Sequence, residues 1–388
     1  MNVTERFLKY VTFATASDED STTFPSTSGQ LVLADYLTEE LRMIGVADAQ
    51  RDLNGYVYGH IPATPGFENE PVIGLIAHMD TSPDAPGENV NPKIVKYDGK
   101  NLPMIDDRYI GEDMIVSDGT TLLGADDKAG VAEIVSACER LINGEVKHGA
   151  VSICFTPDEE IGSGADRFDH KRFAADFAYT VDGGELGGIE YENFNAAAVR
   201  LNVYGLNTHP GSAKGKMRNA ALYLNEFISM LPDAETPAHT EGREGFYHVS
   251  YVNGTESKAE LHMIIRDHDR EKFEGRKLFV SRLAAYLNDK YGDGTFSLQI
   301  TDSYYNMREI IEKHMEIVER AKEAMLANGV EPVITAIRGG TDGARLSFEG
   351  LPCPDISTGG MNYHSIYEAI PASALGKMTD IIVKIVEA

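Results

Sequence analysis

The first part of the chain alternates between short apolar runs and segments whose apolar residues repeat at helical spacing. Residues 71–77, 150–155 and 177–181 are continuous apolar runs, the pattern of strands buried on both faces of a sheet. Residues 33–44 and 131–141 carry leucine, isoleucine and valine three or four positions apart, which predicts helices. Strands that alternate with helices indicate an α/β fold with a mostly parallel sheet and helices on both faces.

The pattern changes near residue 195. The next segments predict, in order, strand, helix, strand, strand, helix and strand, at about residues 197–206, 217–231, 245–252, 258–266, 272–287 and 295–301. The dipeptide Asn253-Gly254 favours a tight hairpin turn between the two adjacent strands. This order is that of a ferredoxin-like βαββαβ unit.

The α/β pattern then resumes. We expect a helix at 308–328, a strand at 332–337 and a C-terminal helix at 372–386. The chain is therefore predicted to form one domain from residues 1–194 and 306–388, interrupted by an inserted domain of residues 195–305.

Charge and composition exclude several classes of protein. The 388 residues contain 35 Lys+Arg against 61 Asp+Glu, a net charge of -26. Nucleic-acid-binding surfaces need the opposite sign, and anionic membranes are disfavoured for the same reason. The N-terminus lacks the apolar core of a signal peptide, no apolar run approaches 18 residues, and the three scattered cysteines suit neither a disulfide framework nor a thiolate zinc site. We expect a cytoplasmic protein.

Acidic residues and histidines gather in five short clusters beside predicted elements. They are His78-Met79-Asp80, Gly124-Ala125-Asp126-Asp127-Lys128, Thr156-Pro157-Asp158-Glu159-Glu160, Val181-Asp182-Gly183-Gly184 and Asn362-Tyr363-His364. Ligands of open parallel sheets bind beyond the carboxyl ends of the strands, so we expect the clusters to converge there.

Two histidines and three carboxylates can hold two zinc-type ions if one carboxylate bridges them, and such a pair of ions can activate a water molecule. The adjacent Glu159 and Glu160 offer one metal ligand and one proton acceptor. Asp80 lies two positions after His78, points the same way in an extended segment, and can hydrogen-bond the second ring nitrogen. Each cluster alone is more typical of a structural pair, a helix cap, a turn or a solvated loop, and only the set of clusters favours a metal site.

Two further kinds of motif are candidates for ligand binding. The glycine-rich segments 162–164 and 183–188 lack the third glycine or the following helix of nucleotide-binding loops, which argues against a nucleotide site. His209 precedes Pro210-Gly211 in the inserted domain. A histidine held in this rigid turn could contact a substrate or be an ordinary turn residue.

These motifs resemble those of the di-zinc exopeptidases, a family that includes carboxypeptidase G, aminoacylase and dipeptidase V. Longer strings are similar to the tripeptide aminopeptidases within that family, at residues 121–134, 155–160, 244–248, 302–309 and 337–344. The similarity extends from near residue 5 to near residue 385.

The resemblance implies two Zn²⁺ per subunit. His78 and Asp182 would bind one ion, Glu160 and His364 the other, and Asp126 would bridge them. The 1–194 and 306–388 domain would then be the zinc-binding catalytic domain.

The resemblance also implies roles for other residues. Glu159 would be the general base and Asp80 would orient His78, and the peptide bond after Asp126 would be cis. The resemblance also implies substrate-binding roles: His209 in the inserted domain would stabilise the oxyanion, and Arg266 and Arg338 would bind the free carboxylate of a short peptide. For both arginines a structural salt bridge is the alternative.

By this resemblance the protein would release the N-terminal residue from tripeptides. It would be a homodimer built through residues 195–305 as a lid, with His209 acting in its own or the partner's site. The alternatives are another exopeptidase or N-deacylase on the same scaffold (dipeptidase, carboxypeptidase or aminoacylase) and a non-catalytic binding protein. The presence of Glu159 argues against the last, because a binding protein needs no base.

Overall fold

The computed structural model describes all 388 residues, and the chain divides into two compact units. Unit 1 comprises Met1–Tyr191, Met307–Thr335 and Thr341–Ala388. Unit 2 comprises Glu192–Asn306 and Ala336–Gly340. No helix combines the length and the apolar character needed to cross a membrane.

An eight-stranded sheet forms the centre of unit 1. In spatial order its strands are β1 (Gln50–Arg51), β2 (Val57–Ile61), β6 (Val151–Thr156), β3 (Ile73–His78), β7 (Phe177–Val181), β14 (Asp355–Ile356), β8 (Gly188–Asn193) and β13 (Val333–Ile337). The four central neighbours β6, β3, β7 and β14 pair in parallel, whereas β1 with β2, β2 with β6, and β14 with β8 pair antiparallel. The predicted α/β fold with a parallel core is confirmed.

The register of the central strands brings their carboxyl ends to one edge. His78 pairs with Thr156 at the ends of β3 and β6, and Ile356 pairs with Val181 at the ends of β14 and β7. Every residue of β3 and β6 is buried. These strands read as continuous apolar runs because both of their faces are covered.

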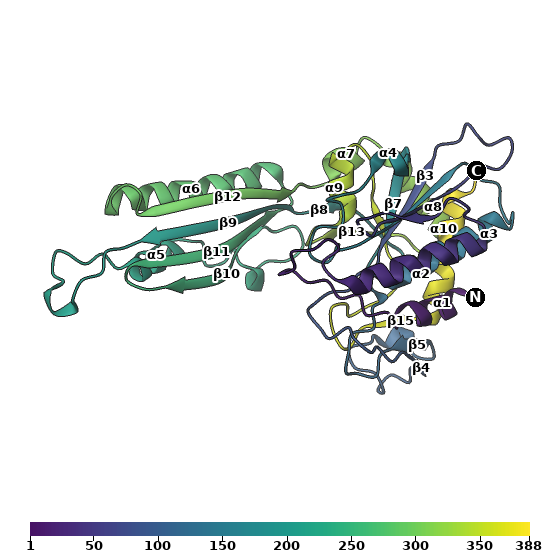
Figure 1. Cartoon of the computed structure of the whole chain (residues 1–388), viewed down its shortest axis with the longest axis horizontal. Coiled ribbons are helices and arrows are strands. Elements are labelled where there is room, and N and C mark those ends of the chain that lie inside the picture. The colour runs from purple at the N-terminus through teal and green to yellow at the C-terminus, as the bar shows by residue number, and fades with distance from the viewer. The chain divides into compact units, whose positions relative to one another are not determined.

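Helices cover the large sheet. They are α1 (Val3–Tyr10), α2 (Ser28–Ile44), α3 (Ala125–Ile142), α4 (His170–Phe173), α7 (Arg308–Ile311), α8 (Met315–Ala327), α9 (Asp342–Phe348) and α10 (Ala372–Val386). Figure 1 shows α4 and α9 on the upper side of the sheet and α2 and α3 on the lower side. Helix α2 ends at Gly45, whose φ of 112° lies in the left-handed region that favours glycine.

The single helix expected at residues 308–328 is wrong, because the chain breaks between α7 and α8. Ile311 and Ile317 are both buried, whereas Glu312 and Lys313 between them are exposed. In one continuous helix two residues six apart point about 120° away from each other. The break lets both isoleucines enter the core.

A small antiparallel sheet in unit 1 had no sequence prediction. It consists, in spatial order, of β15 (Ala369–Pro371), β5 (Asp113–Val116) and β4 (Lys93–Lys96). Strand β4 is largely exposed, so it lacks the apolar pattern that marks a buried strand. A separate small core lies here, and it includes Met114, Met361 and Ala369.

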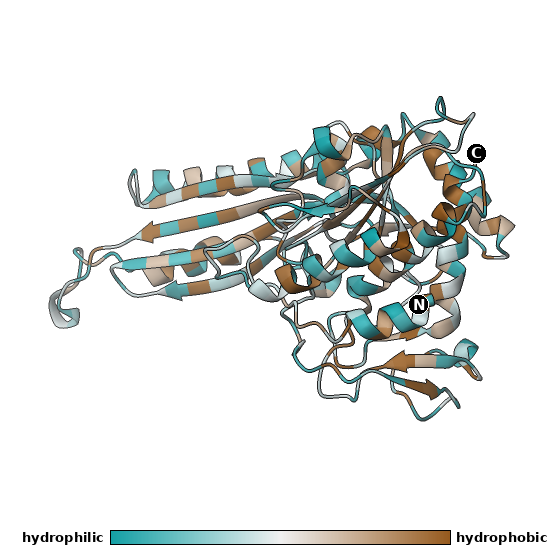
Figure 2. Cartoon of the chain, turned by 45° about the vertical axis from the view of Figure 1, so that its right-hand side comes forward, coloured by the Kyte–Doolittle hydropathy of each residue, from teal (hydrophilic) through white to brown (hydrophobic).

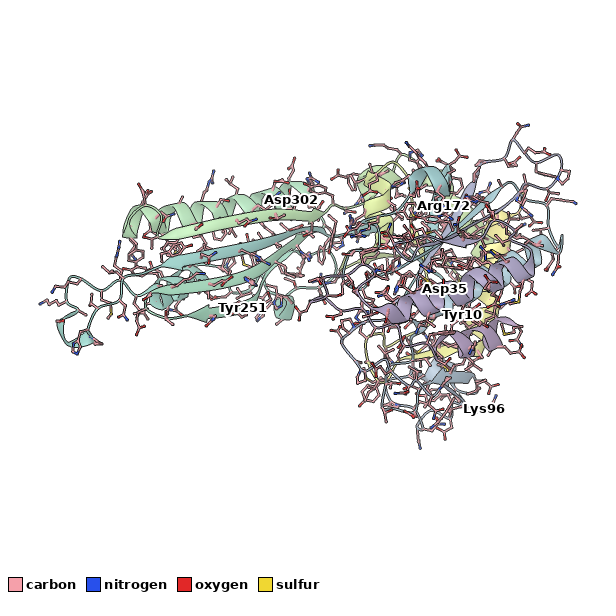
Figure 3. The ribbon with its side chains drawn as sticks, in the orientation of Figure 1. Tyr10, Asp35, Lys96, Arg172, Tyr251 and Asp302 are labelled. Atoms are coloured by element: carbon pink, nitrogen blue, oxygen red, sulfur yellow. The ribbon has the colours of Figure 1, made fainter.

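Unit 2 has the predicted βαββαβ order. Its elements are β9 (Asn195–Tyr204), α5 (Ala220–Ser229), β10 (Phe246–Gly254), β11 (Lys258–Asp267), α6 (Arg270–Tyr291) and β12 (Phe296–Tyr304). The sheet order is β10-β11-β9-β12, and all pairs are antiparallel. Figure 2 shows hydrophobic and hydrophilic residues alternating along these strands, as expected for a sheet with one face on a core and one in solvent. Figure 3 labels Tyr251 and Asp302, which lie on the two edge strands β10 and β12.

The hairpin turn between β10 and β11 comes later than the sequence suggested. Asn253 and Gly254 are still paired in the ladder, and the Thr255 N–H donates to Lys258 O at 2.7 Å across the turn. A Cβ on Gly254 would lie 2.7 Å from the Cβ of Ala259. The glycine therefore allows a close cross-strand approach instead of forming the turn.

Candidate metal centre

The candidate metal ligands follow strands whose carboxyl ends meet. His78 is the last residue of β3, Asp182 follows β7, and Glu160 lies in the turn after β6. The parallel register of β6, β3 and β7 places these three strand ends side by side. The predicted convergence of these clusters is present in unit 1.

Three of these side chains form what we call the inner ligand group: His78, Asp126 and Asp182. Nε2 of His78 lies 2.9 Å from Oδ1 of Asp126 and 3.5 Å from Oδ1 of Asp182. The His78 side chain is only 2% exposed. The ligand atoms lie within 4.8 Å of one another, close enough to share one ion.

The outer ligand group consists of Asp126, Glu160 and His364. Nε2 of His364 lies 3.0 Å from Oε2 of Glu160 and 3.4 Å from Oδ2 of Asp126. Asp126 thus presents one carboxylate oxygen to each group. That is the geometry of a carboxylate that bridges two cations.

Asp80 lies behind the inner group and is completely buried. Its Oδ1 is 3.3 Å from Nδ1 of His78. The same carboxylate accepts the backbone N–H groups of Glu159 and Glu160, each at 3.1 Å. One side chain therefore lies beside the ring of His78 and holds the turn that carries both glutamates.

Asp84 takes the corresponding place behind the outer group, and sequence reasoning missed it. Its Oδ2 lies 3.2 Å from Nδ1 of His364. The Asp84 side chain is 69% exposed, and no spacing in the sequence connects it with a histidine 280 residues away.

The acidic side chains of the outer group stabilise positive charge at His364. Burial raises the pKa of the Glu160 carboxyl to about 7 against the opposing effect of the His364 hydrogen bond. Hydrogen bonds with Asp126 and Glu160 raise the pKa of His364 to about 11. No lysine or arginine forms a salt bridge with Asp126, Glu160 or Asp182, so the cluster lacks its own permanent positive charge.

An orphaned atom of the outer group favours a bound cation. Oε1 of Glu160 is buried and has no hydrogen-bond partner. A buried carboxylate oxygen without a partner is costly, and a divalent cation would satisfy it. Imidazole nitrogens and carboxylate oxygens are donors that zinc accepts. The residues present therefore fit a pair of zinc-type ions.

Glu159 is half-buried and directly precedes Glu160 of the outer group. Burial raises the pKa of its carboxyl well above the ordinary value, His78 opposes this rise, and the charges of Asp182, Asp342 and Glu160 add to it. Because the charges of these neighbours shift its pKa, the Glu159 carboxyl interacts electrostatically with the ligand groups.

The start of α3 brings Asp126 to this edge of the sheet. The Asp126–Asp127 peptide bond is cis, as the resemblance implied. Asp127 accepts the N–H groups of His78 and Gly130, at 3.1 and 3.2 Å. A Cβ on Gly130 would lie 2.0 Å from Val181 O, so only glycine lets α3 pack this closely on the end of β7.

Two other buried carboxylates support the site, and neither was singled out as a site residue from the sequence. Asp158, at a φ of 56°, accepts hydrogen bonds from Ser26 N at 2.6 Å and Gln30 Nε2 at 2.6 Å, which holds the turn before Glu159. Glu368 accepts backbone N–H groups at the start of α3. Side-chain bonds to distant backbone leave no local sequence pattern that could reveal them.

The predicted substrate-binding residues all lie in unit 2. His209 is exposed at the start of a short 3₁₀ turn, Pro210–Ser212, and its Nδ1 accepts the Gly211 N–H at 3.2 Å. The Arg266 guanidinium lies 5.4 Å from the centre of the Tyr304 ring.

Arg338 is bound to backbone oxygens. Its Nη1 donates to Gly242 O at 2.6 Å, and its Nη2 donates to Thr240 Oγ1 at 3.1 Å. Neither Arg266 nor Arg338 forms a salt bridge with a carboxylate, so the structural ion pair that was the alternative is absent.

Comparisons with known proteins agree on one family. A family model described as a peptidase dimerisation domain matches residues 191–295. Peptidase T of Caldanaerobacter subterraneus is 53% identical over 401 residues, which cover 99% of this chain and 98% of that protein.

Solved structures share the fold. Aminopeptidase PepT from Bacillus cereus has a TM-score of 0.79 at 23% identity, covering 99% of this chain and 97% of its own. A tripeptidase from Staphylococcus aureus has a TM-score of 0.82 at 21% identity, with coverage of 100% and 97%. A dinuclear metal binding peptidase of the M20 family from Bacillus subtilis has a TM-score of 0.68 at 16% identity, with coverage of 99% and 96%.

Proposed function

Since the chain belongs to the peptidase T family of metallopeptidases, we propose that it is a tripeptide aminopeptidase that uses two zinc ions to release the N-terminal residue. One observation carries the two-ion site: Asp126 directs Oδ1 to the inner and Oδ2 to the outer ligand group. The substrate class is supported by the relatives, which are named peptidase T, aminopeptidase and tripeptidase.

The chain's own residues divide the chemical work. When bound, two divalent ions supply Lewis-acid polarisation of the peptide carbonyl and lower the pKa of a water molecule. Glu159 accepts the proton of the attacking water and returns it to the leaving amine. Asp80 holds the backbone of Glu159 and Glu160, so the base and a ligand keep their relative positions.

We assign substrate binding to residues of unit 2. Arg266 and Arg338 would bind the free carboxylate of the peptide, because a guanidinium forms paired hydrogen bonds with a carboxylate. Both arginines flank Phe246, which pairs with Arg266 across the ladder and lies 5.8 Å from the Arg338 guanidinium. His209 would stabilise the oxyanion.

Unit 2 is also our candidate for the dimer interface, and unit 1 for the zinc-binding catalytic domain. The dimerisation-domain model covers most of unit 2, and the exposed edge strands of its sheet can pair with a second copy. Three buried cysteines without a disulfide fit the cytoplasm, where thiols stay reduced.

Product analysis of an unblocked tripeptide tests the proposal. With zinc present, Leu-Gly-Gly should yield free leucine and Gly-Gly, and exhaustive chelation should abolish the reaction. Release of the last residue would instead identify a carboxypeptidase. Cleavage only of N-acylated amino acids would identify a deacylase, and an inert protein that binds the peptide would be a binding protein.

Carboxylate recognition has its own test. Replacing Arg266 or Arg338 with alanine should raise the Michaelis constant for tripeptides and weaken the discrimination against C-terminally amidated peptides. A wild-type enzyme that cleaves amidated and free tripeptides equally well would refute carboxylate binding.

Subunit mixing tests whether His209 acts in the partner's site. Inactive Glu159→Ala and His209→Ala proteins are allowed to exchange subunits. If His209 acts on the partner's site, each mixed dimer has one complete site, and activity should recover to roughly a quarter of wild type. With exchange proven, an inactive mixture would show that His209 acts within its own chain.

A further inference from the structure

Three backbone N–H groups at the start of α3 converge on one buried carboxylate, that of Glu368. Leu123 N and Gly124 N each donate to Oε2 at 2.8 Å, and Asp126 N donates to Oε1 at 3.0 Å. The Glu368 side chain forms no salt bridge with a lysine or arginine. Backbone amides at the start of a helix therefore hold this carboxyl group in place.

These bonds hold the backbone of the shared metal ligand itself. Gly124 precedes the helix with a φ of 85°, and Asp126 has a non-helical backbone at φ -88° and ψ 103°. Only two side-chain torsions separate the Asp126 backbone from its carboxylate. Fixing its N–H therefore restricts where its two oxygens can lie.

Glu368 also belongs to the loop that carries His364. Met361 and Ala369 exchange N–H···O bonds of 2.8 and 3.0 Å, which close the loop, and the Glu368 N–H donates to Ser365 O at 3.2 Å. Ala369 then enters β15, which pairs with β5. The side chain of Glu368 thus connects the His364 loop with the turn that presents Asp126.

We propose that Glu368 is a positioning residue that holds Asp126 in its bridging orientation before metal binds and so couples the two ligand groups. The inference rests on the proposed two-metal function. Glu368 touches neither ion and takes no part in proton transfer. It supplies a preorganised backbone, so that binding of metal does not have to order the turn.

The variant Glu368→Gln tests this role. Glutamine keeps the size of the side chain but replaces one acceptor oxygen with an amide group, which leaves at least one N–H without its acceptor. Affinity for Zn²⁺, measured by chelator competition, should fall about 10- to 100-fold. Both ions should be affected, because the two groups share Asp126.

The matched control is Glu40→Gln. Glu40 is also a buried carboxylate of unit 1, and it accepts hydrogen bonds from Arg6 and from Tyr10, which Figure 3 labels. Its loss should lower the melting temperature and leave zinc affinity unchanged. The proposal is overturned if folded Glu368→Gln binds zinc within about twofold of wild type, or if Glu40→Gln weakens zinc binding to the same extent.

Hydrogen exchange of the metal-free wild type gives a second test that needs no variant. The amides of Leu123, Gly124 and Asp126 should exchange as slowly without zinc as with it. Exchange that speeds up more than about tenfold on metal removal would mean that the metal orders the turn, which refutes preorganisation. A wild type that binds no divalent metal would refute the proposed function instead. The hold of Glu368 on the turn would then be tested by amide exchange in metal-free Glu368→Gln, which should be faster at Leu123, Gly124 and Asp126 than in metal-free wild type; equal rates would overturn it.

Discussion

The inner and outer ligand groups use the same donor types in different surroundings. His78 is 2% exposed and has behind it Asp80, which is fully buried. His364 is 41% exposed and has behind it Asp84, which is 69% exposed. Both histidines direct Nε2 to Asp126 and Nδ1 to an aspartate of the segment 80–84.

The difference follows from the elements that carry the ligands. His78 and Asp182 continue buried parallel strands, whose positions are set by the ladder and by packing on both faces. His364 lies in a loop, at a φ of 58° that is uncommon for a residue with a side chain. A ligand on a buried strand end loses little freedom on binding metal, whereas a ligand on an exposed loop loses more. We therefore expect the inner ion to bind more tightly and exchange more slowly.

The largest expected effect of a substitution is on turnover, and it comes from Glu159, which belongs to neither ligand group. Glu159→Gln removes the base and no metal ligand, so turnover should fall about 10²- to 10⁴-fold while both ions stay bound. Turnover and metal content are measured on the same preparation. Loss of zinc from the variant would instead make Glu159 a ligand and leave Glu160 as the candidate base.

The histidine ligands test the two groups separately. His364→Ala should lower the affinity of the outer group for its ion by more than about 100-fold, which is more than the loss of a supporting residue causes. The inner ion should stay bound. His78→Ala should lower the affinity of the inner group for its ion by a similar factor. It should also lower the free energy of unfolding, because removal of a buried side chain leaves a cavity. Metal content after dialysis against a weak chelator shows which ion each variant has lost. Two variants that each lose both ions equally would show that the groups do not bind independently.

Replacing Asp80 or Asp84, the aspartates beside the two histidines, should lower metal affinity less than replacing the histidines does. The loss should be larger at the inner group than at the outer group. Asp80→Ala should lower the affinity of the inner ion about 10- to 100-fold. Asp84→Ala should lower that of the outer ion less than about tenfold, because water screens an exposed contact. Chelator competition measures both. Equal losses in the two variants would contradict the idea that burial sets the difference.

Much of the fold was accessible from the sequence because it depends on local periodicity. The strand at 177–181 and the C-terminal helix at 372–386 have the predicted bounds, since each has a clear apolar pattern with distinct ends. The largely exposed β4 and the break after Ile311 were missed, because neither changes the local pattern enough. The resemblance to metallopeptidases is confirmed by the 53% identity to a peptidase T.

The sequence by itself determined the order of elements and the chemistry available at the strand ends. The acidic and histidine clusters beside buried strands were visible in the sequence, but His78, Asp126, Glu160, Asp182 and His364 could be named as a ligand set only because their motifs resemble those of the di-zinc exopeptidases. Only the tertiary structure decided that the two oxygens of Asp126 face different imidazoles, that Asp84 reaches His364, and that Glu368 holds the backbone of a residue 242 positions away. Periodicity describes which face of an element is buried, whereas these contacts depend on how distant segments pack and which way each side chain turns.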